Sequence, residues 1–205
     1  MTGFDAIVWF MHMRSIIEDS TNQYAFLAVD YPGYGHSDGA PSPEAIHESV
    51  RSAFGKAIEE LNDEYGLKPV DATIIGHSLG SAVATSWLAE DPPDSIPIRH
   101  LVLSAPFTSI ADMASHIFGL PRMLSWMISR HNWDNEKALK QLLESGVVKG
   151  KVTIIHGTMD EIVPFHMGEK LGKLSSLKTR LIPLNDYSHN NILDSYKMYA
   201  YAISE

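Results

Sequence analysis

Short apolar runs alternate with longer amphipathic stretches along most of this chain. Each run is apolar at successive positions, which is typical of parallel strands that are covered on both faces. Strands that alternate with helices predict the α/β class, with a mostly parallel sheet and helices on both faces. The runs expected to form strands are residues 6–10, 25–29, 72–75, 101–103, 152–155 and 179–184.

Helix signals lie between these runs. Ser42, Pro43 and Glu44 supply an N-cap, a proline at the first helical position and an acid in the first turn. Apolar residues then recur at helical spacing, and Gly66 marks the end of this helix: Ile46, Val50, Phe54, Ile58 and Leu61. Further helices are expected at residues 15–22, after Ser78, at 165–174 and at 192–203.

Residues 110–143 have an irregular helical pattern that is rich in large apolar side chains: Met113, Ile117, Phe118, Met123, Leu124, Trp126, Met127 and Trp133. No repeat, low-complexity tract or linker interrupts the chain. We therefore expect one domain over residues 1–205.

Composition narrows the classes of function. The chain has 205 residues, with 44% hydrophobic and 20% charged residues, an ordinary globular balance that argues against disorder. The formal net charge of −9 argues against nucleic acid as the main partner. Because there is no cysteine, disulfides and cysteine catalysis are excluded.

Membrane and export signals are weak in this sequence. No apolar run approaches the ~18 residues of a spanning helix. Residues 1–10 lack the charged region and cleavage site of a signal peptide. A cytoplasmic protein and a soluble domain of a membrane-associated protein fit these expectations equally well.

The motif Gly76-His77-Ser78-Leu79-Gly80 lies between a predicted strand and a predicted helix. In that context G-x-S-x-G forms a tight turn that exposes the serine, and the glycines remove Cβ atoms that would collide. The alternative is a serine in an ordinary turn. We predict that Ser78 is a nucleophile and that the Leu79 N–H, at a helix N-terminus, faces developing negative charge.

A serine needs a base, and the base needs an orienting acid. Asp160 follows the strand at 152–155, and His189 follows the strand at 179–184. Active-site groups gather at the carboxyl ends of such strands, so we predict Asp160 as the acid and His189 as the base. Glu161 is expected to point elsewhere. The alternative interpretation, which each residue alone would favour, is that Asp160 is a turn residue and His189 a histidine of a surface loop.

Ten histidines raise the question of a metal site, but the sequence does not support one. His47-Glu48 begins an H-E-x-x-H motif, which fails because position 51 is arginine. We expect His77 to pack at the turn around Ser78, and His36 and His156 to hold loops. No metal and no cofactor are predicted.

Together these motifs resemble the α/β-hydrolase superfamily. The stretches that carry the resemblance are residues 29–37, the Ser78 motif, Ser104 to Ile110, the Asp160 loop and His189. Residues 76–85, 106–110 and 163–165 look most like the branch of monoacylglycerol and lysophosphatidylserine lipases and depalmitoylating thioesterases. The resemblance implies a triad of Ser78, Asp160 and His189 and a helical lid insertion at about 110–145.

Two features depart from the family pattern. The chain begins at about the third strand of the family, so the run at 25–29 would be an unpaired apolar edge. Such an edge predicts a homodimer or aggregation. The family's third strand ends in His-Gly, whereas this chain reads Met11-His12-Met13-Arg14. The second oxyanion donor would then be the Met13 N–H, from a loop without glycine.

The sequence thus predicts a serine hydrolase that cleaves carboxylic esters of acyl lipids such as monoacylglycerol or lysophospholipid. Its partner would be a small acyl ester, and contact with a membrane surface is left open. The alternatives are an acyl-protein thioesterase or amidase, which use the same triad, and a scaffold that has lost activity. The expected pocket residues are Phe107, Met113, Trp126, Met127 and Ile162.

Overall fold

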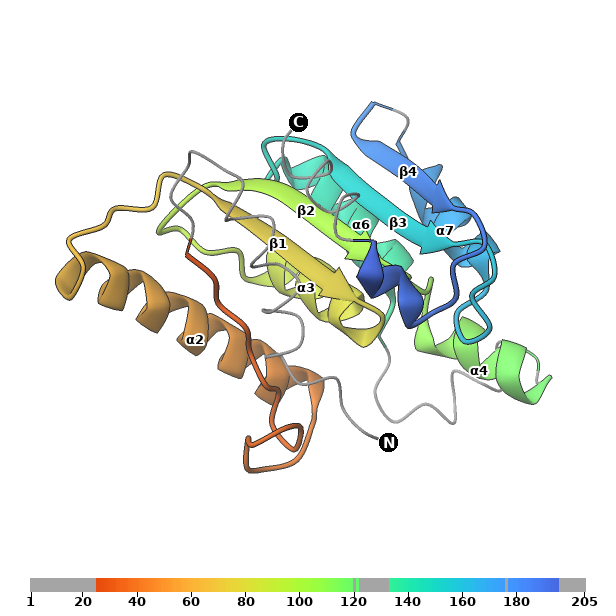
Figure 1. Cartoon of the computed structure of the whole chain (residues 1–205), viewed down its shortest axis with the longest axis horizontal. Helices are drawn as coiled ribbons and strands as arrows, with labels where there is room; N and C mark the ends of the chain where they lie inside the picture. The colour runs from red at the N-terminus through yellow and green to blue at the C-terminus, as the bar shows by residue number, and fades with distance from the viewer. Residues whose placement is uncertain (1–24, 120, 122–132, 176, 196–205) are drawn as a thin grey trace. The chain divides into compact units, whose positions relative to one another are not determined.

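The computed structural model describes residues 25–119, 121, 133–175 and 177–195, and Figure 1 shows the helices and strands that they form. The chain divides into two compact units, residues 71–192 and the remainder on either side, and each unit is described by itself. The predicted elements at 6–10 and 15–22 lie outside the described residues. Of the closing helix, the described part is a short 3₁₀ turn, η1 (Asn191–Asp194).

The first unit contains the predicted helix, α2 (Pro43–Asp63). The Ser42 hydroxyl accepts a hydrogen bond from the Ala45 N–H at 3.2 Å, as the capping signal predicts. Beyond the helix, Gly66 takes a left-handed conformation (φ 64°), and its N–H donates to the Asn62 carbonyl. The start and the end of this helix are therefore encoded locally.

The predicted strand at residues 25–29 is wrong. These residues form no strand, and Phe26 and Leu27 are 38% and 47% exposed. An apolar run becomes a strand only where a neighbour supplies the hydrogen-bond ladder, and none of the described strands pairs with this segment. The expected homodimer through an exposed strand edge thus loses its structural basis.

The second unit holds a sheet of parallel strands in the order β1 (Ala72–His77), β2 (Ile98–Ser104), β3 (Val152–Gly157) and β4 (Thr179–Leu184). All residues of β3 are buried, and β2 is buried except at Arg99. The continuous apolar runs are explained by this two-sided burial. Since the strands are parallel, their carboxyl ends meet at one edge of the sheet.

Three helices lie on one face of this sheet: α3 (Leu79–Glu90), α6 (Asn135–Ser145) and α7 (Phe165–Gly172) (Figure 1). The four strands are neighbours in the order in which they occur along the chain. Because each connection between parallel strands is a right-handed crossover, all of the connecting helices lie on the same face of the sheet. α3 packs against β1 and α6, and α7 packs against β3 and β4. The α/β class is confirmed. Among the described residues, no helix is both long and apolar enough to cross a membrane.

The segment between β2 and β3 leaves the sheet and returns to it at a narrow neck. The Ile110 N–H donates to the Trp133 carbonyl at 2.9 Å, and the Glu136 N–H donates to the Thr108 carbonyl at 3.0 Å. Within the segment, α4 (Ile110–Phe118) is capped by Ser109 and ends with two exposed side chains, Ile117 and Phe118.

The two helices of this segment differ in burial. α6 buries Leu139, Leu142 and Leu143 and packs against α3, so it belongs to the helical layer on the sheet. The lid was expected over about 110–145, but its last part, α6, is a helix of the sheet layer. A lid stays a prediction for residues 110–134. Of these, residues 120 and 122–132 lie outside the described residues.

Candidate active site

Ser78 occupies a strained turn between β1 and α3. Its backbone angles are φ 51° and ψ −116°, a conformation that residues with a side chain rarely adopt. A Cβ atom at Gly76 would lie 2.3 Å from the Gly80 carbonyl oxygen, so a larger residue at position 76 would collide with the start of the helix. The reason given for the first glycine of the motif is confirmed.

Neighbouring backbone groups hold the strained serine. The Ser78 N–H donates to the Ser104 carbonyl at 2.9 Å, which ties the turn to the end of β2. The Ser78 carbonyl accepts from the Ser81 N–H at 3.0 Å and from the Ser81 hydroxyl at 2.5 Å. Leu79 is the first residue of α3, so helix geometry gives its N–H no partner within the helix. This N–H can stabilise an anion beside Ser78.

Asp160 is fixed by a tight turn after β3. Its Oδ1 accepts from the Ile162 N–H at 2.9 Å and from the Val163 N–H at 2.7 Å. Its Oδ2 lies 2.8 Å from Nδ1 of His189, and its side chain is fully buried. Burial alone would raise the pKa of Asp160, but hydrogen bonds from His156, His189 and Val163 outweigh it and hold the pKa well below its usual range.

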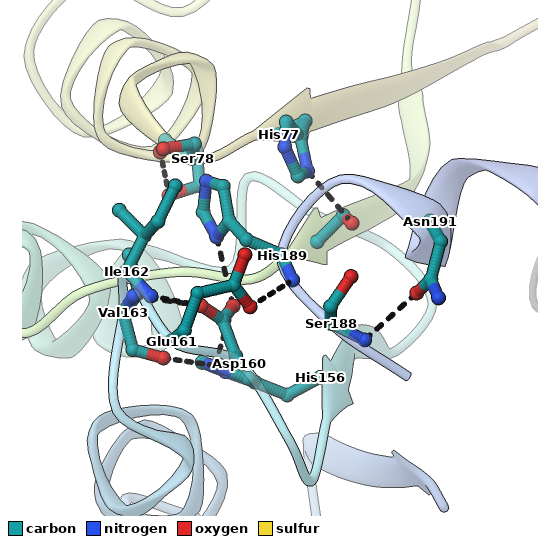
Figure 2. A network of polar contacts seen from close by, with 12 residues as sticks. His77, Ser78, His156, Asp160, Glu161, Ile162, Val163, Ser188, His189 and Asn191 are labelled. Atoms are coloured by element: carbon teal, nitrogen blue, oxygen red, sulfur yellow. Dashed lines mark hydrogen bonds and ion pairs between the residues drawn. The ribbon is translucent and has the colours of Figure 1, made fainter. Parts of the chain in front are cut away.

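His189 lies in the loop after β4, and its ring extends from Asp160 toward Ser78 (Figure 2). Because Asp160 engages Nδ1, the proton of the neutral ring belongs on that nitrogen, which leaves Nε2 as an acceptor. Such a ring can take a proton from a serine hydroxyl. The structure therefore brings together the three residues predicted to act as nucleophile, base and acid.

Glu161 differs from its expectation. Its carboxylate accepts a hydrogen bond from the backbone N–H of His189 at 3.3 Å, so it points toward the loop that carries His189 and not away from it. Glu161 and His189 are far apart in the sequence and meet only through the pairing of β3 with β4. No local sequence signal could have revealed this contact.

His77 packs against His189, with ring centroids 4.9 Å apart and an angle of 46° between the planes. Its Nδ1 lies 3.1 Å from the Ser104 hydroxyl on the neighbouring strand. Burial, followed by repulsion from a charged His189, lowers the pKa of His77 to about 3. His77 is therefore neutral at pH 7. It packs against the ring of His189 beside the turn at Ser78, as the sequence predicted.

His156 holds the Asp160 loop, as expected from the sequence. Its Nε2 lies 2.9 Å from the Val163 carbonyl oxygen and 3.4 Å from Oδ2 of Asp160 (Figure 2). The sequence analysis did not predict the contact between His156 and Asp160. The available signal was their separation of four residues across the turn that follows β3, which brings the two side chains to the same strand end.

Comparison with known proteins identifies the family of this chain. Residues 20–143 match the family described as "Serine aminopeptidase, S33". The chain belongs to this family. It is accordingly an α/β-hydrolase of the serine hydrolase kind.

Curated relatives of this α/β-hydrolase include lysophosphatidylserine lipase ABHD12 from Danio rerio, at 29% identity over 187 residues, covering 84% of the chain and 47% of the relative. The α/β-hydrolase domain-containing protein WAV2 from Arabidopsis thaliana is 32% identical over 148 residues, covering 68% and 45%. The chain thus spans about half the length of the curated relatives it matches.

Solved structures support the fold of this α/β-hydrolase. The α/β-hydrolase from Vibrio vulnificus superposes with a TM-score of 0.67 at 24% identity, covering 98% of the chain and 70% of that protein. The esterase RhEst1 from Rhodococcus superposes with a TM-score of 0.62 at 16% identity, covering 93% and 82%. At this identity the likeness concerns the fold alone.

The remaining predicted site residues of this α/β-hydrolase have varied settings. Phe107 is buried, and its carbonyl accepts from the Asn135 amide at 3.1 Å. Met113 is half-buried on α4, and Ile162 is 44% exposed beside Asp160. Met13, Trp126 and Met127 lie outside the described residues. Asn135 was missed; its amide also donates to the Ser81 hydroxyl at 3.3 Å and so links α6 to the turn at Ser78.

A separate cavity of about 310 Å³ lies between α4 and α7, and Ser78, Asp160 and His189 do not line it. Its lining is mostly polar: Thr108, Asp112, Ser115, His116, His166, Met167 and Lys170. One lining cation, Lys170, pairs with Glu136 at 2.7 Å. Within the described residues, no group of three or more acidic or histidine side chains could hold a metal ion.

Proposed function

We propose that this α/β-hydrolase cleaves carboxylic esters of acyl lipids, such as monoacylglycerol or lysophospholipid, with Ser78 as nucleophile. The observation that carries the proposal is the 2.8 Å contact between His189 and Asp160, at the sheet edge that also presents Ser78 in a strained turn. A neutral histidine that is oriented by a buried carboxylate is the arrangement that activates a serine hydroxyl.

In the proposed reaction His189 removes the proton of the Ser78 hydroxyl as the oxygen attacks the ester carbonyl. Asp160 keeps the His189 ring oriented and stabilises its charged form. The Leu79 N–H donates to the oxyanion of the tetrahedral intermediate, and the Met13 N–H is the proposed second donor. His189 returns its proton to the departing alcohol, and water then hydrolyses the acyl-enzyme.

The acyl-lipid class is supported by the relatives and by the surface near the site. The relative from Danio rerio is named a lysophosphatidylserine lipase. In this chain, Met159 and Ile162 flank Asp160 and are 63% and 44% exposed. Exposed apolar side chains beside a hydrolytic site suit an acyl chain better than a polar substrate.

Labelling with a fluorophosphonate probe tests the nucleophile. We expect one adduct by intact mass, its absence in Ser78→Ala, and its persistence in Ser109→Ala, a serine that caps α4. Equal labelling of the Ser78→Ala variant would contradict the assignment. No labelling of the folded wild-type protein would favour the alternative of an inactive scaffold.

The bond that is cleaved requires a second measurement, because the same residues serve esters, thioesters and amides. The family description names an aminopeptidase, so an amide substrate is the specific alternative. Turnover of an ester, a thioester and an anilide with the same medium-length acyl group should be compared, together with an aminoacyl anilide. We expect the ester to have the largest kcat/KM; faster cleavage of the aminoacyl anilide would assign a peptidase.

A further inference from the structure

Asp160 contacts two histidines through one oxygen atom. Oδ2 lies 2.8 Å from Nδ1 of His189 and 3.4 Å from Nε2 of His156. We propose that His156 is a positioning residue that shares this oxygen with His189 and thereby sets the pH below which His189 is lost as a base. The inference rests on the proposed function, because it assigns His189 the role of base.

The surroundings of His156 determine which ring nitrogen carries the proton. Nε2 faces two acceptors, the Val163 carbonyl and the Asp160 carboxylate. Nδ1 is buried and has no polar partner among the described residues. A proton on Nδ1 would be a buried donor without an acceptor, which is costly. The proton therefore lies on Nε2, where it faces the Val163 carbonyl oxygen at 2.9 Å and the Asp160 carboxylate at 3.4 Å.

Packing prevents His156 from turning away. The residue is fully buried, and its ring meets Phe165 edge-on at 5.7 Å. On the other side, a Cβ atom at Gly168 would lie 2.2 Å from Nδ1 of His156. The glycine in α7 is thus what leaves room for the ring at this place.

The shared oxygen has a predictable consequence for the base. A carboxylate oxygen that accepts a hydrogen bond from His156 has less negative charge available to stabilise the charged form of His189. Removing the His156 donor should strengthen the attraction between Asp160 and protonated His189. His189 would then keep its proton to a higher pH. The depressed pKa of Asp160, to which the His156 hydrogen bond contributes, agrees with this coupling.

Other groups also face the pair of Asp160 and His189. His77 packs on the His189 ring from the end of β1, and the Glu161 carboxylate accepts from the His189 backbone N–H. His77 is neutral over the working range because its pKa is lowered to about 3. These groups stay in place when only His156 is changed, so the variants isolate the His156 contact.

The test compares His156→Gln with His156→Met. Glutamine can place an amide N–H near the position of Nε2, whereas methionine has a similar length and no donor. We expect the acidic limb of the kcat/KM profile to move to higher pH by about half to one unit in the methionine variant. The glutamine variant should return toward the wild-type midpoint. The control is His100→Phe, which changes a buried histidine near the start of β2 and should leave the midpoint unchanged.

Titration of His189 in the free protein by NMR, with ¹³C-labelled histidine and a His189→Asn variant for assignment, gives a readout without catalysis. A higher titration midpoint in His156→Met than in His156→Gln supports the inference, even if no substrate is found and the proposed function fails. Equal midpoints in the two variants would overturn it, even with active enzyme. If the methionine variant does not fold, His156→Asn replaces it, because its shorter amide cannot reach Asp160.

Discussion

The two ends of the parallel sheet in the second unit differ in the burial and hydrogen bonding of their polar side chains. At the carboxyl end, the side chains of His156, Asp160 and His189 are buried: Asp160 is hydrogen-bonded to His189 at 2.8 Å and lies 3.4 Å from His156, which bonds to the Val163 carbonyl. His77 packs on the ring of His189. At the amino end, the ion pair of Asp71 and Arg99 has an N–O distance of 3.4 Å and is partly exposed to solvent. Each of the buried side chains at the carboxyl end makes at least one hydrogen bond, so this end is the more tightly constrained of the two.

Two buried histidines, His156 and His100, show the difference between the two ends in hydrogen bonding. At the end of β3, Nε2 of His156 lies 2.9 Å from the Val163 carbonyl oxygen and 3.4 Å from Oδ2 of Asp160. Near the start of β2, Nε2 of His100 has no hydrogen-bond partner within the described residues. Burial, and next the charge of Arg99, lower the pKa of His100. The comparison shows that burial of a histidine alone does not indicate a site. What marks the site is convergence of several such groups on one carboxylate.

The largest expected effect is at the carboxyl end. Asp160→Asn should lower kcat of ester hydrolysis by about 10⁴-fold, because an amide can favour the wrong tautomer of His189. The matched control is Asp71→Asn, the same chemical change at the amino end, which should keep wild-type kcat. Steady-state kinetics on a p-nitrophenyl ester gives both values. A loss below tenfold in Asp160→Asn would remove Asp160 from the proposed triad.

The next largest effect concerns the turn at Ser78. Gly76→Ala should destabilise the protein by about 3 kcal/mol, because the added Cβ would collide with backbone atoms of Gly80 and Ser81, which can move only at a cost. Gly55→Ala, in the middle of α2 with nothing within 4 Å of the new Cβ, should instead stabilise its helix by about 0.5–1 kcal/mol. Urea unfolding of each variant measures the difference, and equal midpoints would show that the turn tolerates a side chain.

A smaller effect is expected for acid stability. The pKa of His77 is about 3 when folded and 6.5 unperturbed, so the unfolded chain binds more protons between these values, and stability falls as the pH is lowered through this window. Between pH 7 and pH 5 the loss from His77 is about 2 kcal/mol. His77→Phe keeps a ring beside His189 and removes this loss. Unfolding followed by the fluorescence of buried Trp87 at both pH values would detect it; the same pH dependence in variant and wild type would contradict the assignment.

The smallest effect is expected at the amino end. Arg99→Gln removes the ion pair with Asp71, whose partners are partly exposed, and should change the free energy of unfolding by less than about 0.5 kcal/mol. Ester hydrolysis should not change. A loss above 1 kcal/mol by urea unfolding would show that the amino end is as constrained as the carboxyl end.

The sequence predicted those elements whose signals are local. Ser42 and Pro43 located the start of α2, and the apolar runs located the strands of the second unit. The positions of Asp160 and His189 followed from a general property of parallel sheets, that strand ends converge. Each of these predictions needed only a short stretch of chain or a rule of topology.

The parts that could not be predicted depend on contacts between distant segments. The apolar run at 25–29 was misassigned because strand formation requires a partner that the run itself does not specify. The contacts of Glu161 with His189 and of Asn135 with Ser81 arise only when separate elements pack together. Side-chain direction in a loop is set by those neighbours, so the expectation for Glu161 failed.

The neck formed by Thr108, Ile110, Trp133 and Glu136 has a consequence for how such proteins diverge. Because the chain leaves the sheet and returns to it at one point, two backbone hydrogen bonds already hold the ends of residues 110–133 together. The entropic cost of a longer loop then grows only slowly with its length. The intervening residues can be exchanged or extended while the sheet, and with it Ser78, Asp160 and His189, keeps its geometry. Under the proposed function, exchange of this one segment is a route to a new substrate range.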